Sequence, residues 1–388
     1  MARRRPDPAH DRLSFDRRTL LKTVGAAALL GTVPAADAAA APAAADGPTY
    51  PATFRGMPGD GPGRPRICLG APVSPDDAQI RRLKQIGVSH VLMGGPPSPW
   101  KEDDLRARMD RYKAGGIEII NMMIGGFNDV IWGGPKAEEQ TAHVVESIKV
   151  AGKLGLPVIE YNFYAHRLTE GYKLEEGRAG AGYTAYDYTL SKDLPPREGV
   201  GTHTRAQQLE RAGRFLKTIV PVAEKANVRL ALHPNDPPVP LSRGSEQIMA
   251  SVEQWKTYLK LVESPFNGMT FDCGVTREMG EDPVKVCRYL SERDCINHVH
   301  FRNVVVRTPY VDYTEVFLDD GQVDLFGVMR ELVKSKYPRG IYPEHPRLID
   351  MDREYGKFQN QYPGGGGFAG ETYNVGYTRA MLQAALTL

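Results

Sequence analysis

The 388-residue sequence predicts an α/β fold: a single-domain (β/α)8 TIM barrel with long loops at the C-terminal face of its strands. Two observations carry this prediction. Eight short apolar, β-branched segments alternate with eight segments of helical periodicity, which is the element count of that barrel. No GxGxxG motif follows the first expected strand, which disfavours the nucleotide-binding version of the alternative, an open doubly wound sheet.

The expected strands share a β-branched, apolar composition and lie at 66–73, 88–94, 117–124, 157–163, 228–233, 268–273, 296–301 and 340–344. The first expected helix is opened by Ser74 as the cap and Pro75 in the first turn. Gly87, Gly115 and Gly155 fall where helices are expected to end. The later helices are expected at about 101–114, 136–154, 204–226, 244–262, 282–292, 323–336 and 371–386.

Three connections are longer than ordinary loops, at 165–200, 304–320 and 345–370. Each follows the C-terminal end of an expected strand. In a barrel of this class that end carries the active site. We therefore expect these segments to form a lid or a rim around the substrate.

The first residues of the chain are expected to be a targeting segment, so that 1–46 is a Tat signal peptide with an Ala/Pro linker and 47–388 is the catalytic domain. Arg17-Arg18 precedes an Ala-rich apolar run, and Ala36-Asp37-Ala38 is a small-x-small cleavage site. The apolar run is too short to span a membrane stably. We expect Tat export to the periplasm or the extracellular space and no membrane association after cleavage. The alternative is a disordered basic tail.

Composition narrows the range of partners. The net charge is +2, and no basic stripe is interleaved with aromatic residues, so nucleic acid is not expected as a partner. The four cysteines match neither a disulfide scaffold nor a CxxC zinc site. Cys287 and Cys295 could pair after export, although buried thiols are favoured. A homo-oligomer stays open.

Four ionisable residues close four successive expected strands, in VRLALH, GMTFD, INHVH and GIYPE: His233, Asp272, His300 and Glu344. Because the C-terminal ends of parallel barrel strands converge on one mouth, we expect these side chains to meet there. Two imidazoles and two carboxylates suit a divalent cation. Mn²⁺ is favoured, with Mg²⁺, Fe²⁺, Co²⁺ and Zn²⁺ open. Each residue alone could instead be structural.

Strand alternation separates Asp272 from its neighbour Cys273. In GMTFDCG, Asp272 shares a face with Thr270, whereas Cys273 shares the other face with Met269 and Phe271. Met and Phe suit the layer between a barrel and its helices. The alternation therefore favours Asp272 as the ligand, with Cys273 as the alternative.

Other polar residues are expected at the same mouth. Arg302 could clamp a substrate carboxylate with two hydrogen bonds, or pair with a neighbouring strand. His345 is a candidate acid or base. Asp236 could orient an imidazole or simply form a turn. The residues expected to face the substrate are Tyr161, Asn162, Asn235 and Asp236.

Seven segments together resemble the mannonate dehydratase family. They are YNFYAHR (161–167), HPNDPPVP (233–240), GMTFDCG (268–274), HVHFRNV (298–304), EVFLDDGQVDLFGVMREL (315–332), PEHPRLIDMD (343–352) and ETYNVGYTRAMLQA (371–384). The resemblance implies a metal-dependent TIM barrel of the xylose-isomerase-like superfamily. It also implies a lyase that removes water from D-mannonate to give 2-keto-3-deoxygluconate.

The resemblance also assigns roles to residues. It places metal ligands at His233, His300, Glu344 and the position of Asp272, and acid/base residues at His345 and Tyr373. The family usually has Cys at the position of Asp272 and Asp at that of Glu344. The pair of Asp and Glu looks more like the sugar isomerases and epimerases of the superfamily, which is the alternative function. A carbohydrate-binding protein without catalysis is a third. An exported relative is expected to act on another aldonate, a uronate derivative or an oxidised glycoside.

Overall fold

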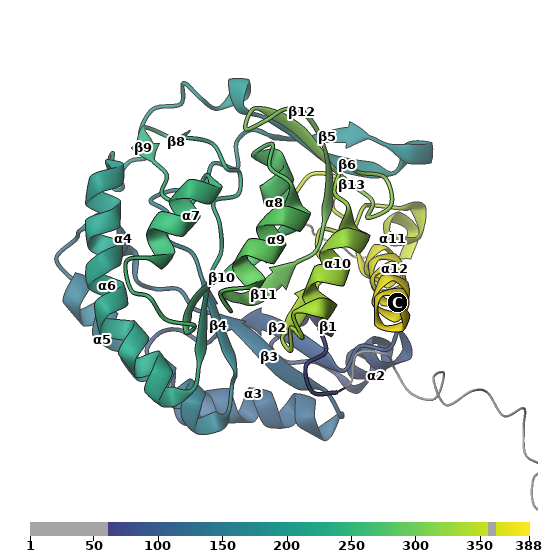
Figure 1. Ribbon diagram of the computed structural model, residues 1–388, viewed down its shortest axis with the longest axis horizontal. Helices are drawn as coiled ribbons and strands as arrows, with labels where there is room; N and C mark the ends of the chain where they lie inside the picture. The colour runs from purple at the N-terminus through teal and green to yellow at the C-terminus, as the bar shows by residue number, and fades with distance from the viewer. Residues whose placement is uncertain (1–60, 356–361) are drawn as a thin grey trace, which may run out of the picture. The chain divides into compact units, whose positions relative to one another are not determined.

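The computed structural model describes residues 61–355 and 362–388, and within them eight parallel strands close into a barrel (Figure 1). Around the barrel the strands follow the order β1, β14, β11, β10, β7, β4, β3, β2. Each overlaps one of the eight expected segments, so the predicted fold class is confirmed. The barrel strands are β1 (Arg66–Gly70), β2 (His90–Gly94), β3 (Glu118–Met123), β4 (Val158–Tyr161), β7 (Arg229–Leu232), β10 (Asn267–Asp272), β11 (Ile296–His300) and β14 (Gly340–Tyr342). The expected export signal and linker, 1–46, lie outside the described residues.

Helices surround the barrel (Figure 1). They are α2 (Asp77–Gln85), α3 (Glu102–Ala114), α4 (Asn128–Trp132), α5 (Ala137–Leu154), α6 (Arg205–Ala226), α7 (Val252–Leu259), α8 (Cys273–Glu278), α9 (Pro283–Ser291), α10 (Leu325–Lys334), α11 (Asp350–Tyr355) and α12 (Phe368–Thr387). The first helix begins later than expected, because Asp76 rather than Ser74 caps it and forms a capping box with Gln79.

A second sheet, which the sequence did not reveal, is built from two of the long connections. β5 (Tyr172–Glu176) and β6 (Gly182–Asp187) follow β4, whereas β12 (Asn303–Thr308) and β13 (Asp312–Val316) follow β11. They pair antiparallel in the order β12, β13, β6, β5. Leu348 of the third long connection bridges to Gly182 at the start of β6. All three long connections therefore meet on the C-terminal side of the barrel. A short hairpin of β8 (Leu241–Ser242) and β9 (Ser245–Glu246) follows β7.

The core lies between the barrel strands and the surrounding helices. Phe271, Cys273 and Trp255 are buried in one large apolar cluster that includes side chains from most of the barrel strands. Burial of this apolar surface is the main force that holds helices on the barrel. All four cysteines are free thiols, so Cys287 and Cys295 do not pair.

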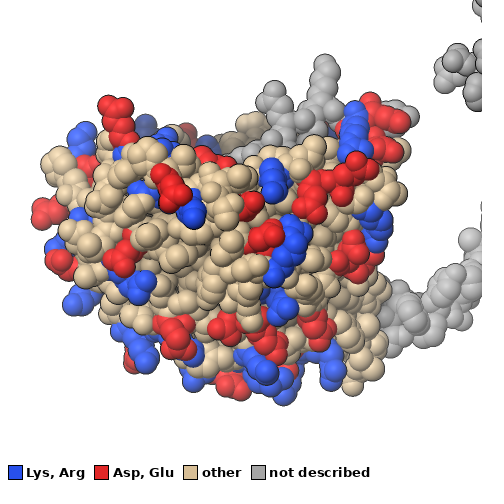
Figure 2. All heavy atoms as spheres, turned by 90° about the horizontal axis from the view of Figure 1, so that it is seen from above, with Lys and Arg blue, Asp and Glu red and all other residues tan. Residues whose placement is uncertain are grey.

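The surface carries both signs of charge. Figure 2 shows Lys and Arg interspersed with Asp and Glu over the face in view. No helix in residues 61–355 or 362–388 has the length and apolar character needed to cross a membrane.

Candidate active site

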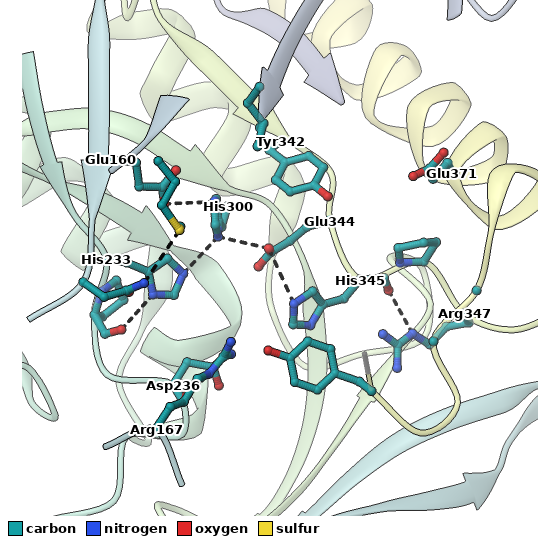
Figure 3. Close-up of a pocket in the computed structure, with 18 of the residues that line it drawn as sticks. Glu160, Arg167, His233, Asp236, His300, Tyr342, Glu344, His345, Arg347 and Glu371 are labelled. Atoms are coloured by element: carbon teal, nitrogen blue, oxygen red, sulfur yellow. Dashed lines mark hydrogen bonds and ion pairs between the residues drawn. The ribbon is translucent and has the colours of Figure 1, made fainter. Parts of the chain in front are cut away.

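Three of the expected metal ligands, His233, His300 and Glu344, lie together at the C-terminal mouth of the barrel (Figure 3), and Asp272 lies beside His233. Asp272 and His300 end the paired strands β10 and β11 in direct register, and His233 and Glu344 follow β7 and β14 closely. One ligand atom from each of Asp272, His300 and Glu344 lies within 4.8 Å of the others. His300 Nδ1 is 3.0 Å from both His233 Nε2 and Glu344 Oε2. Parallel strands thus bring together residues that are far apart in the chain.

Glu160 also belongs to this cluster, although sequence reasoning missed it. Its Oε1 lies 3.3 Å from His300 Nε2 and accepts a hydrogen bond from Thr270 Oγ1 at 2.9 Å. Asn121 Nδ2 donates to the other carboxylate oxygen at 2.7 Å. Burial opposes the charge on Glu160, but the imidazoles around it, His300 foremost, hold its pKa well below the usual range. Glu160 groups with His233 and His300 as a second possible set of ligands.

The surroundings of His300 favour a positive charge at this point of the barrel. Burial works against a charged imidazole, but the carboxylates of Glu344 and Glu160 outweigh it and hold the pKa of His300 well above its usual range. His300 Nε2 is buried and forms an ion pair with Glu160 Oε1 at 3.3 Å. His233 donates from Nδ1 to the Pro234 carbonyl at 2.7 Å, which leaves the lone pair of Nε2 directed at the cluster. These donor types and this local field fit a divalent cation.

The structure separates Asp272 from Cys273 as strand alternation predicts. Asp272 Oδ2 is 3.9 Å from His233 Nε2, and Oδ1 caps α8 by accepting from Val275 N at 2.8 Å. Cys273 is buried in the apolar core, and burial raises the pKa of its thiol well above the usual value. A thiol held in its neutral form within apolar packing is a poor metal ligand.

Arg302 differs from its expected role as a substrate clamp. Its side chain is 1% exposed and is not among the residues that line the cavity at the barrel mouth. Its guanidinium donates to Asp272 at 3.1 Å and to Glu278 of α8 at 2.6 Å, and lies 3.3 Å from Glu344. Arg302 therefore orients two of the expected ligands, Asp272 and Glu344, from outside the cavity. This agrees with the alternative role expected for Arg302, an ion pair with a neighbouring strand.

His345 faces the ligand cluster from the loop after β14. Its Nδ1 is 2.7 Å from Glu315 Oε2 of β13, and its Nε2 is 3.5 Å from Glu344 Oε2. Arg347 donates to the same oxygen of Glu315 at 3.0 Å, which fixes that carboxylate. Burial disfavours the charged form of His345, but the carboxylates of Glu315 and Glu344 favour that form more strongly and raise the pKa of His345. His345 also has a φ of 49°, a strained conformation for a residue with a side chain.

Comparison with known proteins shows which proteins this chain resembles. The profile of D-mannonate dehydratase (UxuA) matches residues 202–386. The mannonate dehydratase of Streptococcus pneumoniae (strain 70585) is 28% identical over 318 residues, which cover 74% of this chain and 84% of that protein. The mannonate dehydratase of Thermotoga petrophila is 26% identical over 307 residues, 70% of this chain and 85% of that protein.

This chain is similar to the mannonate dehydratases.

The fold of the family is shared as well. The crystal structure of mannonate dehydratase from Streptococcus suis serotype 2 superposes with a TM-score of 0.74 at 22% identity, over 84% of this chain and 95% of that one. Mannonate dehydratases are hydro-lyases, so the similarity indicates an enzyme of the lyase class. The family and the candidate ligand groups together point to a divalent metal.

The cavity of this mannonate dehydratase-like barrel has a volume of about 320 Å³ and includes only part of the expected substrate contacts. Asn162 and Asp236 line it. Tyr161 instead points into the core, where its hydroxyl lies 2.9 Å from that of Tyr258. Asn235 is buried and accepts a hydrogen bond from Met249 N at 2.7 Å. Tyr161 and Asn162 are neighbours on one strand, so their side chains point to opposite faces.

Asp236 accepts hydrogen bonds from the loop that follows β4. Arg167 Nη2 donates to Asp236 Oδ2 at 2.7 Å, and the Tyr172 hydroxyl donates to Oδ1 at 2.8 Å. Burial opposes the charge, but Arg302 and Arg167 hold the pKa of Asp236 well below its usual range. Asp236 therefore anchors the first long connection over the cavity, and Arg167 lines the cavity beside it.

Tyr373, the second acid/base residue that the family resemblance implied, is not at the cavity. Its side chain is 38% exposed, and its ring packs at 5.4 Å from that of Phe317 and 6.5 Å from that of Tyr377. Glu371 of the same helix does line the cavity. Two residues are separated by about 200° around an α-helix, so Glu371 and Tyr373 face nearly opposite ways. The structure therefore does not place Tyr373 where the resemblance implied an acid/base residue.

Proposed function

We propose that this protein is a metal-dependent hydro-lyase that removes water from D-mannonate, or from an aldonate of closely similar structure, to give a 2-keto-3-deoxy acid. One observation carries the proposal: His233, His300 and Glu344 line the same cavity as His345, with Asp272 grouped behind them and Glu315 hydrogen-bonded to His345. A cation site beside an oriented proton acceptor is what elimination next to a carboxylate requires.

We assign the metal to His233, Asp272, His300 and Glu344, with Mn²⁺ as the preferred ion. Two nitrogen and two oxygen donors without a thiolate favour Mn²⁺ or Mg²⁺ over softer ions. When bound, the cation supplies a Lewis acid that stabilises negative charge on the substrate's carboxylate and adjacent oxygen. Glu160 would orient His300 through its Nε2, 3.3 Å away.

His345 is suited to take the proton from C2 of the substrate. Its Nδ1–H donates to Glu315 at 2.7 Å, which leaves the lone pair on Nε2 free to accept a proton. Glu315 then stabilises the imidazolium that forms, and Arg347 keeps Glu315 from turning away. The raised pKa of His345 makes Nε2 a stronger base.

The test is turnover of the Mn²⁺-loaded protein on a panel of aldonates, with ketoses as the comparison. We expect a 2-keto-3-deoxy acid from at least one aldonate, and no turnover with His300→Ala or Glu344→Ala. Lys149→Ala, a change on the outer face of α5, is the control for folding. Full turnover in both ligand variants would overturn the proposal. Interconversion of ketoses without elimination would instead favour the isomerase or epimerase alternative.

We also propose that the chain is exported by the Tat pathway to the periplasm or the extracellular space. Arg17-Arg18, the Ala-rich run and Ala36-Asp37-Ala38 appear in the order that such signals require. An exported enzyme would meet another aldonate, a uronate derivative or an oxidised glycoside. Cell fractionation tests this: replacing both arginines by lysine should leave the protein in the cytoplasm, and unchanged export would refute it.

A further inference from the structure

Glu371 is a carboxyl group in the cavity that no part of the site described so far uses. It lies in the first turn of α12, and Figure 3 shows it on the side of the cavity that also carries Tyr342, Glu344 and His345. Within residues 61–355 and 362–388, no hydrogen bond donor and no cation contacts its carboxyl group. Its side chain is partly exposed at the cavity, so a bound substrate could contact it.

The groups around Glu371 favour its protonated form. Asp352 of α11 faces it and is itself occupied by the backbone N–H groups of Gly367, Ala369 and Gly370, at 2.8, 2.9 and 3.1 Å. The other charged or titratable residues on this side of the cavity are Glu344, His345 and Arg347 (Figure 3). Burial and the charge of Asp352 together raise the pKa of Glu371 to about 7. A carboxylic acid that keeps its proton near neutral pH can act as a general acid.

The positions of His345 and Glu371 suit the two residues to different carbons of the substrate. His345 Nε2 lies 3.5 Å from the expected ligand Glu344, so it is close to the end of the cavity that would hold the substrate carboxylate. C2 is the carbon next to that carboxylate. Glu371 lines the same cavity from α12, on the side of Tyr342 away from His300 (Figure 3), and is the carboxyl group left for the next carbon, C3.

We propose that Glu371 is the second catalytic residue, the acid that protonates the hydroxyl group leaving from C3. The inference rests on the proposed dehydration. His345 Nε2 takes the C2 proton, the C2–H electron pair forms the C2–C3 double bond, and the C3–O bond breaks. The leaving oxygen takes the Glu371 proton and departs as water. The enol gains a proton at C3 and loses its hydroxyl proton, so that both residues recover their starting states and the 2-keto-3-deoxy acid is released.

The proposal is tested with Glu371→Gln, which keeps the shape of the side chain and removes the transferable proton. We expect turnover of the aldonate to fall about 10²- to 10⁴-fold, the usual contribution of a general acid. Fluoride leaves without protonation, so the same variant should keep turnover of the matching 3-deoxy-3-fluoro aldonate within about tenfold of the unchanged protein. Exchange of the C2 proton with D₂O, followed by NMR, should also survive. Thr372→Ala, an exposed neighbour on α12, is the matched control.

The outcomes separate this inference from the proposed function. If the unchanged protein eliminates neither water nor fluoride from any aldonate, the proposed function fails first. If it dehydrates the aldonate but Glu371→Gln does so at a similar rate, the role of Glu371 is refuted. Equal loss of water and fluoride elimination in Glu371→Gln would also refute it, because a structural role or a role as base predicts that result.

Discussion

Replacing Arg302 by methionine should destabilise the protein strongly, because this guanidinium is shared by several buried carboxylates. It contacts Asp272 at 3.1 Å, Glu278 at 2.6 Å and Glu344 at 3.3 Å, and its side chain is 1% exposed. Among the described residues, no other cation contacts Glu278. Methionine fills a similar volume without the charge, so the variant isolates the electrostatic loss from the packing loss.

The expected loss follows from the burial of these groups. Removing one partner of a buried ion pair usually costs about 3–5 kcal/mol, because the other charge is left without compensation. For a domain of this size that corresponds to a fall in Tm of about 4–7 °C. We also expect metal affinity to fall by about 10- to 100-fold, since Asp272 and Glu344 lose the group that orients them.

Thermal unfolding followed by circular dichroism, with and without Mn²⁺, measures both effects. The double variant Arg302→Met/Glu278→Gln should recover at least half of the lost stability, because it removes the stranded carboxylate together with its partner. Arg302→Lys keeps the charge and serves as the comparison for geometry. A Tm of Arg302→Met within about 2 °C of the unchanged protein would refute the reasoning, as would a double variant no more stable than the single one.

Four further predictions concern the metal, Asp236 at the cavity rim, Tyr373 on α12 and the pH dependence of stability. Chelation should abolish turnover and lower Tm, and Mn²⁺ at about 100 times its Kd should restore about 2.7 kcal/mol, measured as a shift in unfolding. Asp236→Asn should raise KM more than it lowers kcat, because Arg167 loses its 2.7 Å partner at the cavity rim; an unchanged KM would count against this. Tyr373→Phe should keep turnover within about threefold, since its exposed ring lies outside the cavity; a loss of about 100-fold would restore the role that the family implies. Finally, the raised pKa of Glu371 means that the folded state keeps a proton that the unfolded chain loses above about 4.5. Stability should therefore fall as pH rises from about 4.5 to about 7, by at most about 1.4 kcal/mol per pH unit, and Glu371→Gln should flatten that slope.

The barrel and its ligand cluster could be predicted because both depend on local rules. Apolar runs with helical or strand periodicity mark the elements, and the convergence of parallel strand ends follows from the fold class. The alternation of side chains in β10 was sufficient to separate Asp272 from Cys273. The same rule applied to β4 would have paired Glu160 with Asn162 and directed Tyr161 toward the helices. Glu160 was thus accessible from the sequence, and the error was to treat two neighbours as sharing a face.

The second sheet and the partners of Arg302 could not be predicted in this way. β13 pairs with β6 in a register that joins Tyr313 to Tyr186, and no local pattern specifies a partner so far along the chain. Alternation shows that Arg302 points inward with His300, but Glu278 reaches it from the separate helix α8. Contacts of this kind depend on how loops and helices pack, which a single sequence does not encode in short-range periodicity.

The balance of charge around the cavity explains why metal binding and folding should be coupled. Six buried carboxylates surround the mouth of the barrel: Glu160, Asp236, Asp272, Glu278, Glu315 and Glu344. The guanidinium groups in contact with them come from Arg302, Arg347 and, at the rim, Arg167. The carboxyl groups therefore outnumber the fixed cations. Burial raises the pKa of Glu278 and Asp272 and so favours their neutral forms, and the remaining negative charge is unfavourable unless imidazoles take up protons or a cation binds. A divalent ion supplies the missing positive charge, so His345 does not need to be protonated and can act as a base. A chain whose folded state depends on such an ion would need to acquire it before leaving the cytoplasm, and a pathway that exports folded proteins, such as the one proposed from Arg17-Arg18, meets that need.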